Sequence, residues 1–323
     1  MALAILGLDM KLPSTLSWQL RWSLRLQPWL ERLHLVPSHA AVARWPVARR
    51  KAIKPPAWMT YPSPASVRTQ RETIATADGP LELKWFRTSD MQKPAILFTH
   101  GGGWVAGGLD ALDYLCANLC DRLGVAVVAV DYRLAPDDRF PAALYDCYAA
   151  LEWVAARASG PIVVIGDSAG GNLTAALCLL ARERGGPAIA QQTLIYPTLD
   201  ATLRSPSMSM DMPGATLKQM AAVVQYYLGD HDREDPLASP IHAKDHSGLP
   251  PALIITAGLD LLRDDGSRYA QCLRDAGVSV RYANYPDMLH GFLSHAKLCA
   301  GAPGVLAEIV DEIRPYLVPA PAA

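Results

Sequence analysis

Three residues with the chemistry of a nucleophile, a carboxylate and a base follow one another along the chain, each just beyond a predicted strand. Ser168 lies in the stretch P-I-V-V-I-G-D-S-A-G-G-N, residues 161–172. A serine hydroxyl is a weak nucleophile until a neighbouring base takes its proton, and a histidine base needs a carboxylate to hold its tautomer. We expect His290, in Y-P-D-M-L-H-G-F, and Asp260, in T-A-G-L-D-L-L-R-D-D, to fill these roles. The chemistry indicated is nucleophilic acyl transfer.

The sequence around Ser168 predicts a strand, a very tight turn and a helix in immediate succession. The β-branched run Ile162 to Ile165 stops at Gly166, and a helical pattern begins at Ala169. Small residues flanking the serine let strand and helix pass closely, which exposes the hydroxyl on a strained bend above the helix N-terminus. A G-x-S-x-G pattern alone arises by chance about one time in ten in a chain of this length, and the flanking elements make it more specific.

The carboxylate and the base are expected where later strands end. Asp260 is the first acid beyond the strand Ala252 to Thr256, whereas Asp264 and Asp265 are expected to open the following helix as N-terminal acids. His290 follows the last predicted strand, in a loop that reaches back over the strand ends. The order serine, aspartate, histidine is the one expected of an α/β hydrolase.

A run of glycines meets the next requirement of acyl transfer, which is a set of amide donors for the tetrahedral oxyanion. His100-Gly101-Gly102-Gly103 follows the predicted strand Ala95 to Thr99, and successive glycines allow the backbone to aim its amides at one point. The phosphate-binding patterns G-x-G-x-x-G and G-x-x-x-x-G-K-S/T are both missing from the sequence. His100 itself is expected to be a structural hydrogen-bonding residue.

Predicted strands alternate with predicted helices through most of the chain, which indicates βαβ units around a mostly parallel sheet covered on both faces. A hairpin comes first, with Arg71 to Ala77 and Leu81 to Arg87 flanking Asp78-Gly79. The other strands are predicted at 95–99, 125–131, 162–165, 193–196, 252–256 and 278–282, and the helices at 111–123, 142–157, 169–184, 264–276 and 304–317. The fold class is therefore α/β.

The composition argues against several classes of protein. The 323 residues are 50% apolar, which suffices for one large α/β domain or a domain with a smaller lid. The net charge of −1 gives no field that favours nucleic acid, and no apolar run is long enough to predict a membrane-spanning helix. The start meets Asp9 early and lacks a basic region, which argues against a secretory signal. The 6 scattered cysteines suit buried free thiols in a reducing compartment, so the cytoplasm is expected.

Two segments outside the alternating pattern are candidates for a lid, and the first is N-terminal. Between Leu16 and Leu33, the residues Trp18, Trp22 and Trp29 recur near helical spacing in a basic stretch. This pattern fits either a lid over the pocket or a helix on a membrane surface. The proline-rich connector that follows, Arg44 to Pro64, is expected to contain neither helix nor strand.

The second segment is an insertion between Tyr196 and Leu249. It carries a Met-rich loop, with Met208, Met210 and Met212, and a predicted helix from Ala215 to Leu228. The insertion leaves the carboxyl end of a strand, which is where open α/β sheets bind ligands. A surface loop without function is the alternative.

Together these motifs resemble those of the hormone-sensitive-lipase family of microbial carboxylesterases. They are His100-Gly-Gly-Gly103-Trp104, Asp131-Tyr-Arg-Leu-Ala-Pro136 with Phe140-Pro141-Ala142, Gly166-Asp-Ser-Ala-Gly170, the Asp260 segment and His290-Gly-Phe292. The joint occurrence of these motifs in order, between Lys93 and Phe292, is highly specific. One departure is Asp260-Leu261-Leu262, because the family often has Asp-Pro-Leu, in which the proline stiffens the turn.

The resemblance implies an α/β-hydrolase fold with Ser168 as nucleophile, His290 as base and then acid, and Asp260 as the partner of the histidine. The implied activity is hydrolysis of short- to medium-chain acyl esters through an acyl-enzyme, with a small-molecule ester as substrate and no metal or organic cofactor. Two alternatives stay open: an interfacial lipase on longer chains, with weak membrane contact by the N-terminus but no stable insertion, and a non-catalytic small-molecule receptor. Homodimers are common in the family, but no stretch of this sequence demonstrates an interface.

The resemblance also implies an oxyanion hole formed by the amides of Gly101, Gly102 and Ala169, supported by the segment Asp131 to Pro136. A helical cap would be built from the N-terminal region and an insertion after the sixth strand. The expected boundaries are 1–60 for the N-terminal cap helices and linker, 61–203 and 237–323 for the catalytic domain, and 204–236 for the cap insertion. The candidate pocket residues, for which ordinary packing is the alternative, are Trp18, Trp22, Trp104, Asp167, Met208, Met210 and Met212.

Overall fold

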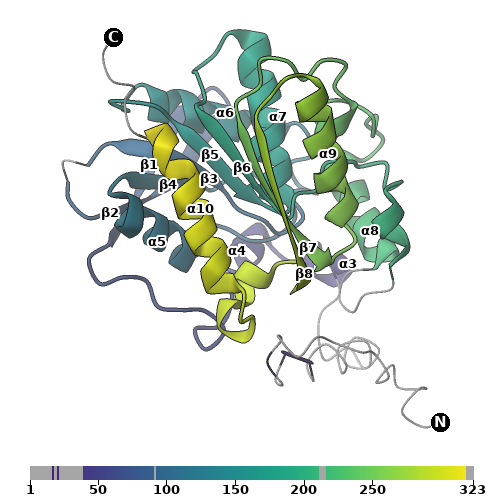
Figure 1. Ribbon diagram of the computed structural model, residues 1–323, viewed down its shortest axis with the longest axis horizontal. Helices are drawn as coiled ribbons and strands as arrows, with labels where there is room; N and C mark the ends of the chain where they lie inside the picture. The colour runs from purple at the N-terminus through teal and green to yellow at the C-terminus, as the bar shows by residue number, and fades with distance from the viewer. Residues whose placement is uncertain (1–16, 18–19, 22–38, 91, 211–215, 318–323) are drawn as a thin grey trace.

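The computed structural model describes residues 17, 20–21, 39–90, 92–210 and 216–317. An eight-stranded sheet with helices on both faces forms the centre of the molecule (Figure 1). The strand order is β1-β2-β4-β3-β5-β6-β7-β8. Neighbours from β4 to β8 are parallel, whereas β2 is antiparallel to both β1 and β4. The predicted α/β class with a mostly parallel sheet is therefore confirmed.

The last two strands are longer than the sequence predicts. Strands β7 and β8 continue to Leu259 and Leu289, which pair with each other. Pro286 is tolerated because β8 is an edge strand and the ladder is irregular between Ala257 and Leu259. The strand bounds are β1 Arg68–Thr76, β2 Gly79–Arg87, β3 Pro94–Thr99, β4 Ala126–Val130, β5 Val163–Asp167, β6 Gln191–Ile195, β7 Ala252–Leu259 and β8 Val280–Leu289.

Two apolar layers enclose the sheet. Helices α6, α7 and α9 pack on one face, and α5 and α10 pack on the other. Successive strand residues point to opposite layers, so that Leu97 of β3 joins the first core while Ile96 and Phe98 join the second. The helices are α5 Asp113–Leu123, α6 Ala142–Ala155, α7 Ala169–Arg184, α9 Arg263–Asp275 and α10 Ala302–Leu317.

Of the helices in the described ranges, three lie outside these layers, namely α3 (His39–Val42), α4 (Val47–Lys51) and α8 (Leu217–Leu228). Helix α3 contacts α8, so the N-terminal segment and the insertion meet in space. The prediction that residues 44–64 contain no helix is wrong, because α4 forms there and is held by the buried side chain of Arg50. Short 3₁₀ segments are η1 Pro206–Ser209, η2 Pro240–His242 and η3 Phe292–Leu298.

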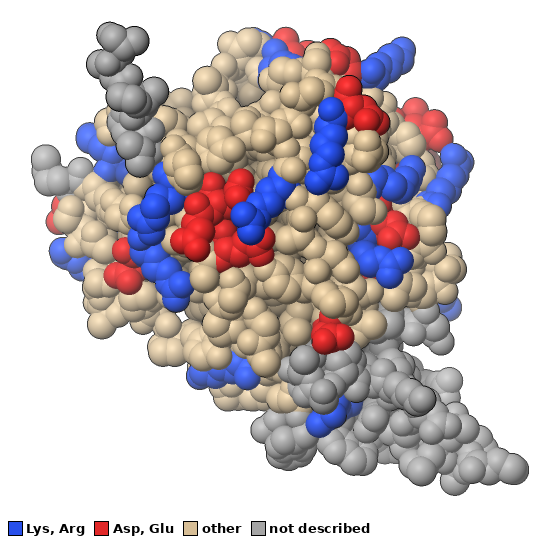
Figure 2. All heavy atoms as spheres, in the orientation of Figure 1, with Lys and Arg blue, Asp and Glu red and all other residues tan. Residues whose placement is uncertain are grey.

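The surface carries interspersed charges of both signs on the face seen in Figure 2. Ion pairs such as Lys84–Asp113 (2.7 Å) and Arg281–Glu308 (2.8 Å) join opposite charges. No helix within the described ranges is long and apolar enough to cross a membrane. All six cysteines are free and all but Cys272 are buried, as predicted.

Candidate active site

Ser168 occupies a bend between β5 and α7, here called the serine bend (residues 166–170). Its φ of 54° and ψ of −118° are values that residues with a side chain rarely adopt. Its amide donates to the carbonyl of Ile195 at 2.8 Å, which ties the bend to β6. A Cβ at Gly166 would overlap the carbonyl of Gly170, and a Cβ at Gly170 would overlap the carbonyl of Thr99. Strand and helix therefore cross at this distance only with glycine at both positions.

The three residues predicted to act together do lie together. Ser168 Oγ is 2.8 Å from His290 Nε2, and His290 Nδ1 is 2.7 Å from Asp260 Oδ2. Each residue directly follows a strand, and the carboxyl ends of parallel strands share one edge of the sheet. When Nδ1–H donates to the carboxylate, Nε2 accepts the hydrogen bond of the serine hydroxyl. The arrangement can remove the hydroxyl proton during attack on a carbonyl.

The turn after Asp260 is held without the proline that the family often has. Asp260 is 1% exposed, and its Oδ1 accepts a hydrogen bond from the Leu262 amide at 2.9 Å. The carbonyl of Leu261 accepts a hydrogen bond from the hydroxyl of Ser207. The Asp260 side chain and the insertion therefore hold this turn in the absence of the proline.

Asp264 and Asp265 lie in the first turn of α9, as the sequence predicts. Asp265 is buried, and it also accepts hydrogen bonds from the amides of Leu199 (3.0 Å) and Asp200 (3.1 Å). Burial raises its pKa to about 7, against the opposing effect of these donors. Asp265 thus anchors the chain that leaves β6, whereas Asp260 contacts His290.

The pKa of His290 lies above its ordinary value of 6.5. Burial lowers this pKa, but the carboxylates of Asp260 and, more weakly, Asp167 raise it, and the net effect is an increase. The side chain of His290 is 28% exposed and lines a cavity. His290 would therefore hold a proton taken from Ser168 more firmly than a free imidazole would.

The glycine loop (residues 100–108) follows β3, and it differs from the prediction at one donor. The amide of Gly101 donates to Asp167 Oδ1 at 2.7 Å, so it is already used and does not face an incoming oxyanion. Gly102 and Gly103 line the cavity instead. Within the described part of the chain, no acceptor is bonded to the amides of Gly102, Gly103 or Ala169. The Gly101 amide is therefore not available as expected, and Gly103 replaces it in the donor set proposed below.

Asp167 holds the glycine loop against the serine bend. Its side chain is 5% exposed and lies so close to Gly101 that a Cβ there would stand 2.5 Å from Oδ2. Burial raises the pKa of Asp167 to about 7, although the Gly101 amide and His290 oppose this shift. The acid of the G-D-S-A-G motif thus connects the two loops that flank the reactive oxygen.

His100 has the structural role predicted for it. Its Nδ1 donates to the carbonyl of Gly101 at 2.7 Å, and its ring stacks on Tyr132 at 4.2 Å. The Tyr132 hydroxyl donates in turn to the His100 carbonyl at 2.7 Å. Burial lowers the pKa of His100 to about 4, so the ring is neutral at pH 7. The segment after β4 thus supports the glycine loop.

A cavity of about 360 Å³ opens over Ser168 and His290. Trp104 forms part of its wall, with a φ of 58° and a ring stacked on Tyr227 at 4.3 Å. Most of the other wall residues are apolar or small. The described lining residues are Val42, Ile53, Gly102, Gly103, Trp104, Ala106, Asp167, Ser168, Tyr196, Thr198, Gln219, Met220, Val223, His290, Gly291 and Ser294.

Comparison with known families agrees with this geometry. The sequence matches the family described as alpha/beta hydrolase fold over residues 96–294, which contain the serine bend, the glycine loop, Asp260 and His290. The chain belongs to the α/β-hydrolase-fold family. The hormone-sensitive-lipase-like motifs place it within the esterase branch of that family, as predicted.

Characterised relatives of this hydrolase are named as esterases. The carboxylic ester hydrolase LipN of Mycobacterium tuberculosis is 41% identical over 239 residues, which are 69% of this chain and 64% of LipN. The carboxylesterase NlhH of the same species is 39% identical over 252 residues, 73% of this chain and 79% of NlhH. The ethyl acetate hydrolase of Pseudomonas putida is 38% identical over 233 residues, covering 69% and 73% of the two chains. The chain is accordingly an enzyme of the serine esterase type.

A solved structure extends the likeness beyond the matched core of the hydrolase. The hyperthermophilic esterase from Pyrobaculum calidifontis superposes with a TM-score of 0.74 at 33% identity, covering 93% of this chain and 98% of that one. The eight-stranded sheet and its flanking helices are therefore the architecture of an esterase.

The residues predicted to line the pocket of the hydrolase do not all lie on the cavity wall. Trp104 and Asp167 lie on the cavity wall. Met208 is 4% exposed and packs in the core, and Met210 packs against the same core, so neither lines the cavity as expected. Met208 is one of the buried residues of the 3₁₀ turn η1, and Met210 follows that turn directly. Trp18, Trp22 and Met212 lie outside the described residues, as does Trp29.

Several cavity residues were not anticipated from the sequence. Met220 and Val223 lie three residues apart on α8, a spacing that marks one face of a helix. The apolar face of α8 could have identified these two residues, because the insertion was already predicted to be a lid. Ile53, in the proline-rich connector, gave no periodic signal, and Tyr196 and Thr198 lie in the irregular chain after β6.

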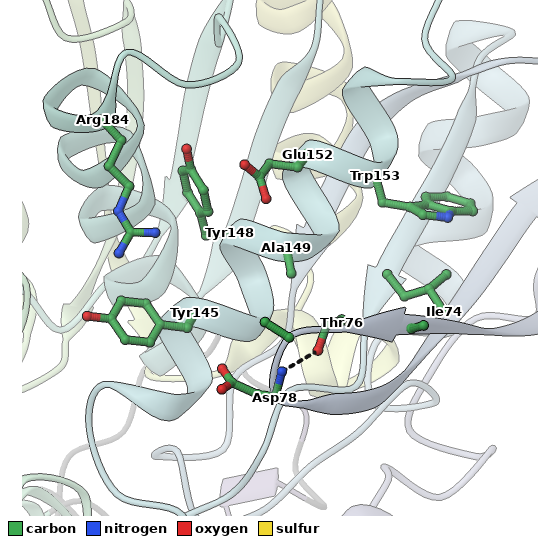
Figure 3. A pocket seen from close by; sticks show the side chains of 11 residues that line it. Ile74, Thr76, Asp78, Tyr145, Tyr148, Ala149, Glu152, Trp153 and Arg184 are labelled. Atoms are coloured by element: carbon green, nitrogen blue, oxygen red, sulfur yellow. Dashed lines mark hydrogen bonds between the residues drawn. The ribbon is translucent and has the colours of Figure 1, made fainter.

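Figure 3 shows a second hollow, whose lining includes the last residue of α7. It has a volume of about 510 Å³ and is bordered by Tyr145, Tyr148 and Glu152 of α6 and by Arg184. Arg184 ends α7, and the 16 residues of that helix separate it from Ser168 by about 24 Å. None of the described residues that line the hollow is a serine, cysteine or histidine. The hollow therefore offers none of the acyl-transfer chemistry assembled at the other end of the helix.

Proposed function

We propose that the enzyme hydrolyses short- to medium-chain carboxylic esters through an acyl-enzyme formed on Ser168. His290 acts as base and then as acid, and Asp260 holds the imidazole in the required tautomer. The observation that carries this proposal is the continuous chain of contacts from Ser168 Oγ to His290 (2.8 Å) and from His290 to Asp260 (2.7 Å), at the floor of a cavity.

In the first half of the reaction, Ser168 Oγ attacks the ester carbonyl while its proton passes to His290 Nε2. The amides of Gly102, Gly103 and Ala169 receive the oxyanion, and collapse of the intermediate expels the alcohol, which takes the proton from Nε2. In the second half, His290 removes a proton from water, the hydroxide attacks the acyl carbon, and Ser168 leaves with that proton as the acid is released.

The preference for short to medium acyl chains rests on the size of the cavity. A volume of about 360 Å³ with an apolar wall suits a modest acyl group. The relative from Pseudomonas putida is named for ethyl acetate, an ester with a two-carbon acyl group. A non-catalytic receptor on this fold usually lacks one of the three contacting residues, and the sequence retains all of them.

The proposed division of the chain keeps the sequence boundaries of 1–60, 61–203, 204–236 and 237–323. The contact between α3 and α8 supports a cap made jointly by the first and third of these segments. Location in the cytoplasm and assembly into a homodimer also remain proposals from the sequence.

The test is hydrolysis of p-nitrophenyl esters from acetate to palmitate by the wild-type enzyme, Ser168→Ala and the matched control Ser247→Ala, in which the serine is exposed. We expect Ser168→Ala to lose at least about 10³-fold in kcat, the control to retain activity, and the chain-length optimum to be no longer than octanoate. Hydrolysis by Ser168→Ala at the wild-type rate would contradict the mechanism. An optimum at palmitate that appears only with emulsified substrate would favour the interfacial lipase.

A further inference from the structure

Arg50 is the largest charged side chain that the described structure buries completely, with 0% exposure. Its guanidinium makes four described contacts, three of them to segments far along the chain. Nε donates to the carbonyl of Trp45 (3.0 Å), and Nη1 donates to the carbonyls of Val105 (2.9 Å) and Ala135 (2.5 Å). Nη2 forms an ion pair with Asp137. Burial of a cation is costly unless it is paired and hydrogen-bonded, and here both conditions are met.

Two of the carbonyls that Arg50 binds, those of Val105 and Ala135, belong to the glycine loop and to the segment that supports it. The amides of Val105 and Ala106 both donate to the carbonyl of Gly102, at 3.2 and 3.0 Å, which closes the turn containing Gly102 and Gly103. The amide of Ala135 donates to the carbonyl of Trp104 at 2.9 Å. One nitrogen of Arg50 therefore joins the turn that carries two of the proposed oxyanion donors to the segment that supports it.

The backbone of α4 makes a further contact with the glycine loop. The amide of Gly107 donates to the carbonyl of Arg50 at 3.1 Å. A Cβ at Gly108 would stand 2.5 Å from the carbonyl of Lys51, so the loop and α4 approach at backbone distance. Lys51 Nζ also donates to Asp131 Oδ2 at 2.6 Å, beside the same supporting segment.

The chain on either side of α4 reaches the cavity. Val42, at the end of α3, and Ile53, just beyond α4, both line it, whereas Arg50 does not. The short helix therefore connects residues of the substrate wall to the turn that carries the oxyanion donors. Arg50 is the side chain that fixes this connection from inside.

We propose that Arg50 is a positioning residue for the oxyanion hole, acting through Val105 and Ala135 without touching substrate. This inference rests on the proposed function. The planar guanidinium presents several donors in a rigid fork, whereas a lysine ammonium on a flexible stem cannot meet four acceptors in that geometry. Preorganised donors contribute most when their placement is accurate, and a displacement of about 1 Å can cost roughly 10²-fold in rate.

The test compares Arg50→Lys with Arg49→Lys, the same exchange at the neighbouring position of α4. Arg49 is exposed and its guanidinium lies over the Trp45 ring at 3.6 Å. We measure kcat and KM on a short-chain p-nitrophenyl ester, and the inhibition constant of a trifluoromethyl ketone, whose serine adduct places an oxyanion in the hole. For Arg50→Lys we expect kcat to fall about tenfold or more with KM changed less than about threefold. We expect the inhibition constant to rise as kcat/KM falls, and Arg49→Lys to behave as wild type.

A lower melting temperature of Arg50→Lys with unchanged kcat and inhibition constant would overturn the proposal, because Arg50 would then be structural only. If Arg50→Lys does not fold, Asp137→Ala decides the question, since it keeps the guanidinium but removes the ion pair that helps to orient it. We expect a fall in kcat of about two- to fivefold in that variant, and an unchanged kcat overturns the proposal. Ser168→Ala run in parallel separates the two hypotheses: activity retained in that variant refutes the proposed function itself.

Discussion

The serine bend and the glycine loop flank the same reactive oxygen, but they are held in place by different means. The bend is fixed by backbone geometry, through the strained φ of Ser168 and through glycines at 166 and 170, where any Cβ would overlap backbone atoms of the bend itself or of Thr99 in β3. The glycine loop is fixed by side chains from elsewhere, namely Asp167, Tyr132 and Arg50. The nucleophile is thus positioned mainly by backbone geometry, and the proposed oxyanion donors are positioned by side-chain contacts.

The largest effect should come from the strand-end residues that serve the bend. Asp260→Asn keeps the shape of the side chain but lets the imidazole adopt the wrong tautomer, so we expect kcat to fall about 10⁴-fold. The acid limb of kcat/KM should also move to lower pH, because loss of this carboxylate removes a group that raises the pKa of His290. Steady-state kinetics between pH 5 and 9 checks both results, and a loss smaller than tenfold would contradict the assigned role of Asp260.

The bend itself can be broken by a single methyl group. Gly170→Ala would push a Cβ into the carbonyl of Thr99, and we expect it to lower the free energy of unfolding by about 1–3 kcal/mol or more. Gly304→Ala is the matched control, because its Cβ meets no atom within 4 Å near the start of α10. That exchange should leave stability unchanged or raise it by about 0.5–1 kcal/mol. Urea unfolding measures both, and equal stability of the two variants would show that the bend does not depend on glycine.

The glycine loop should respond more gradually, because several side chains share its support. Asp167→Ala leaves the buried Gly101 amide without an acceptor, which costs about 1–3 kcal/mol, and we expect kcat to fall about ten- to a hundredfold. Asp167→Asn keeps an oxygen that can accept the hydrogen bond of the Gly101 amide, so its fall in kcat should be smaller. Because the Asp167 carboxylate raises the pKa of His290, both variants should shift the acid limb of kcat/KM to lower pH. A shift to higher pH would contradict this coupling.

The smallest effect is expected at a buried residue that supports the same loop from the segment after β4. Tyr132→Phe removes the hydrogen bond to the His100 carbonyl but keeps the ring that stacks on the imidazole. We expect a loss of about 1 kcal/mol in the free energy of unfolding and a fall in kcat of only a few fold. Calorimetry and kinetics on the same preparation check this, and a loss in kcat as large as that of Asp167→Ala would show that one contact dominates the loop.

The contrast also explains what the sequence could predict. Strand, turn and helix around Ser168 are encoded within twelve neighbouring residues, and Asp260 and His290 follow strands with recognisable patterns. Their meeting follows from sheet topology, since parallel strands end at one edge. The fold class and these three positions were therefore predictable.

The supporting contacts were not predictable, because they join residues far apart in the chain. The use of the Gly101 amide depends on Asp167, 66 positions away, and the burial of Arg50 depends on carbonyls 55 and 85 positions away. No local pattern separates Arg50 from the exposed Arg49 beside it. In the insertion, the sequence predicted α8 but assigned the pocket to Met208 and Met210 instead of Met220 and Val223, since all four are apolar residues in a lid.

The central claim is that Ser168 carries the acyl group, and trapping of the nucleophile tests it most directly. The enzyme is treated with a p-nitrophenyl alkylphosphonate, and the labelled peptide is identified by mass spectrometry after digestion. We predict one phosphonyl group per chain, located on Ser168, with loss of activity in proportion to labelling and no labelling of Ser168→Ala. Complete inactivation with the label on any other residue, or full activity after Ser168 is labelled, would contradict the account.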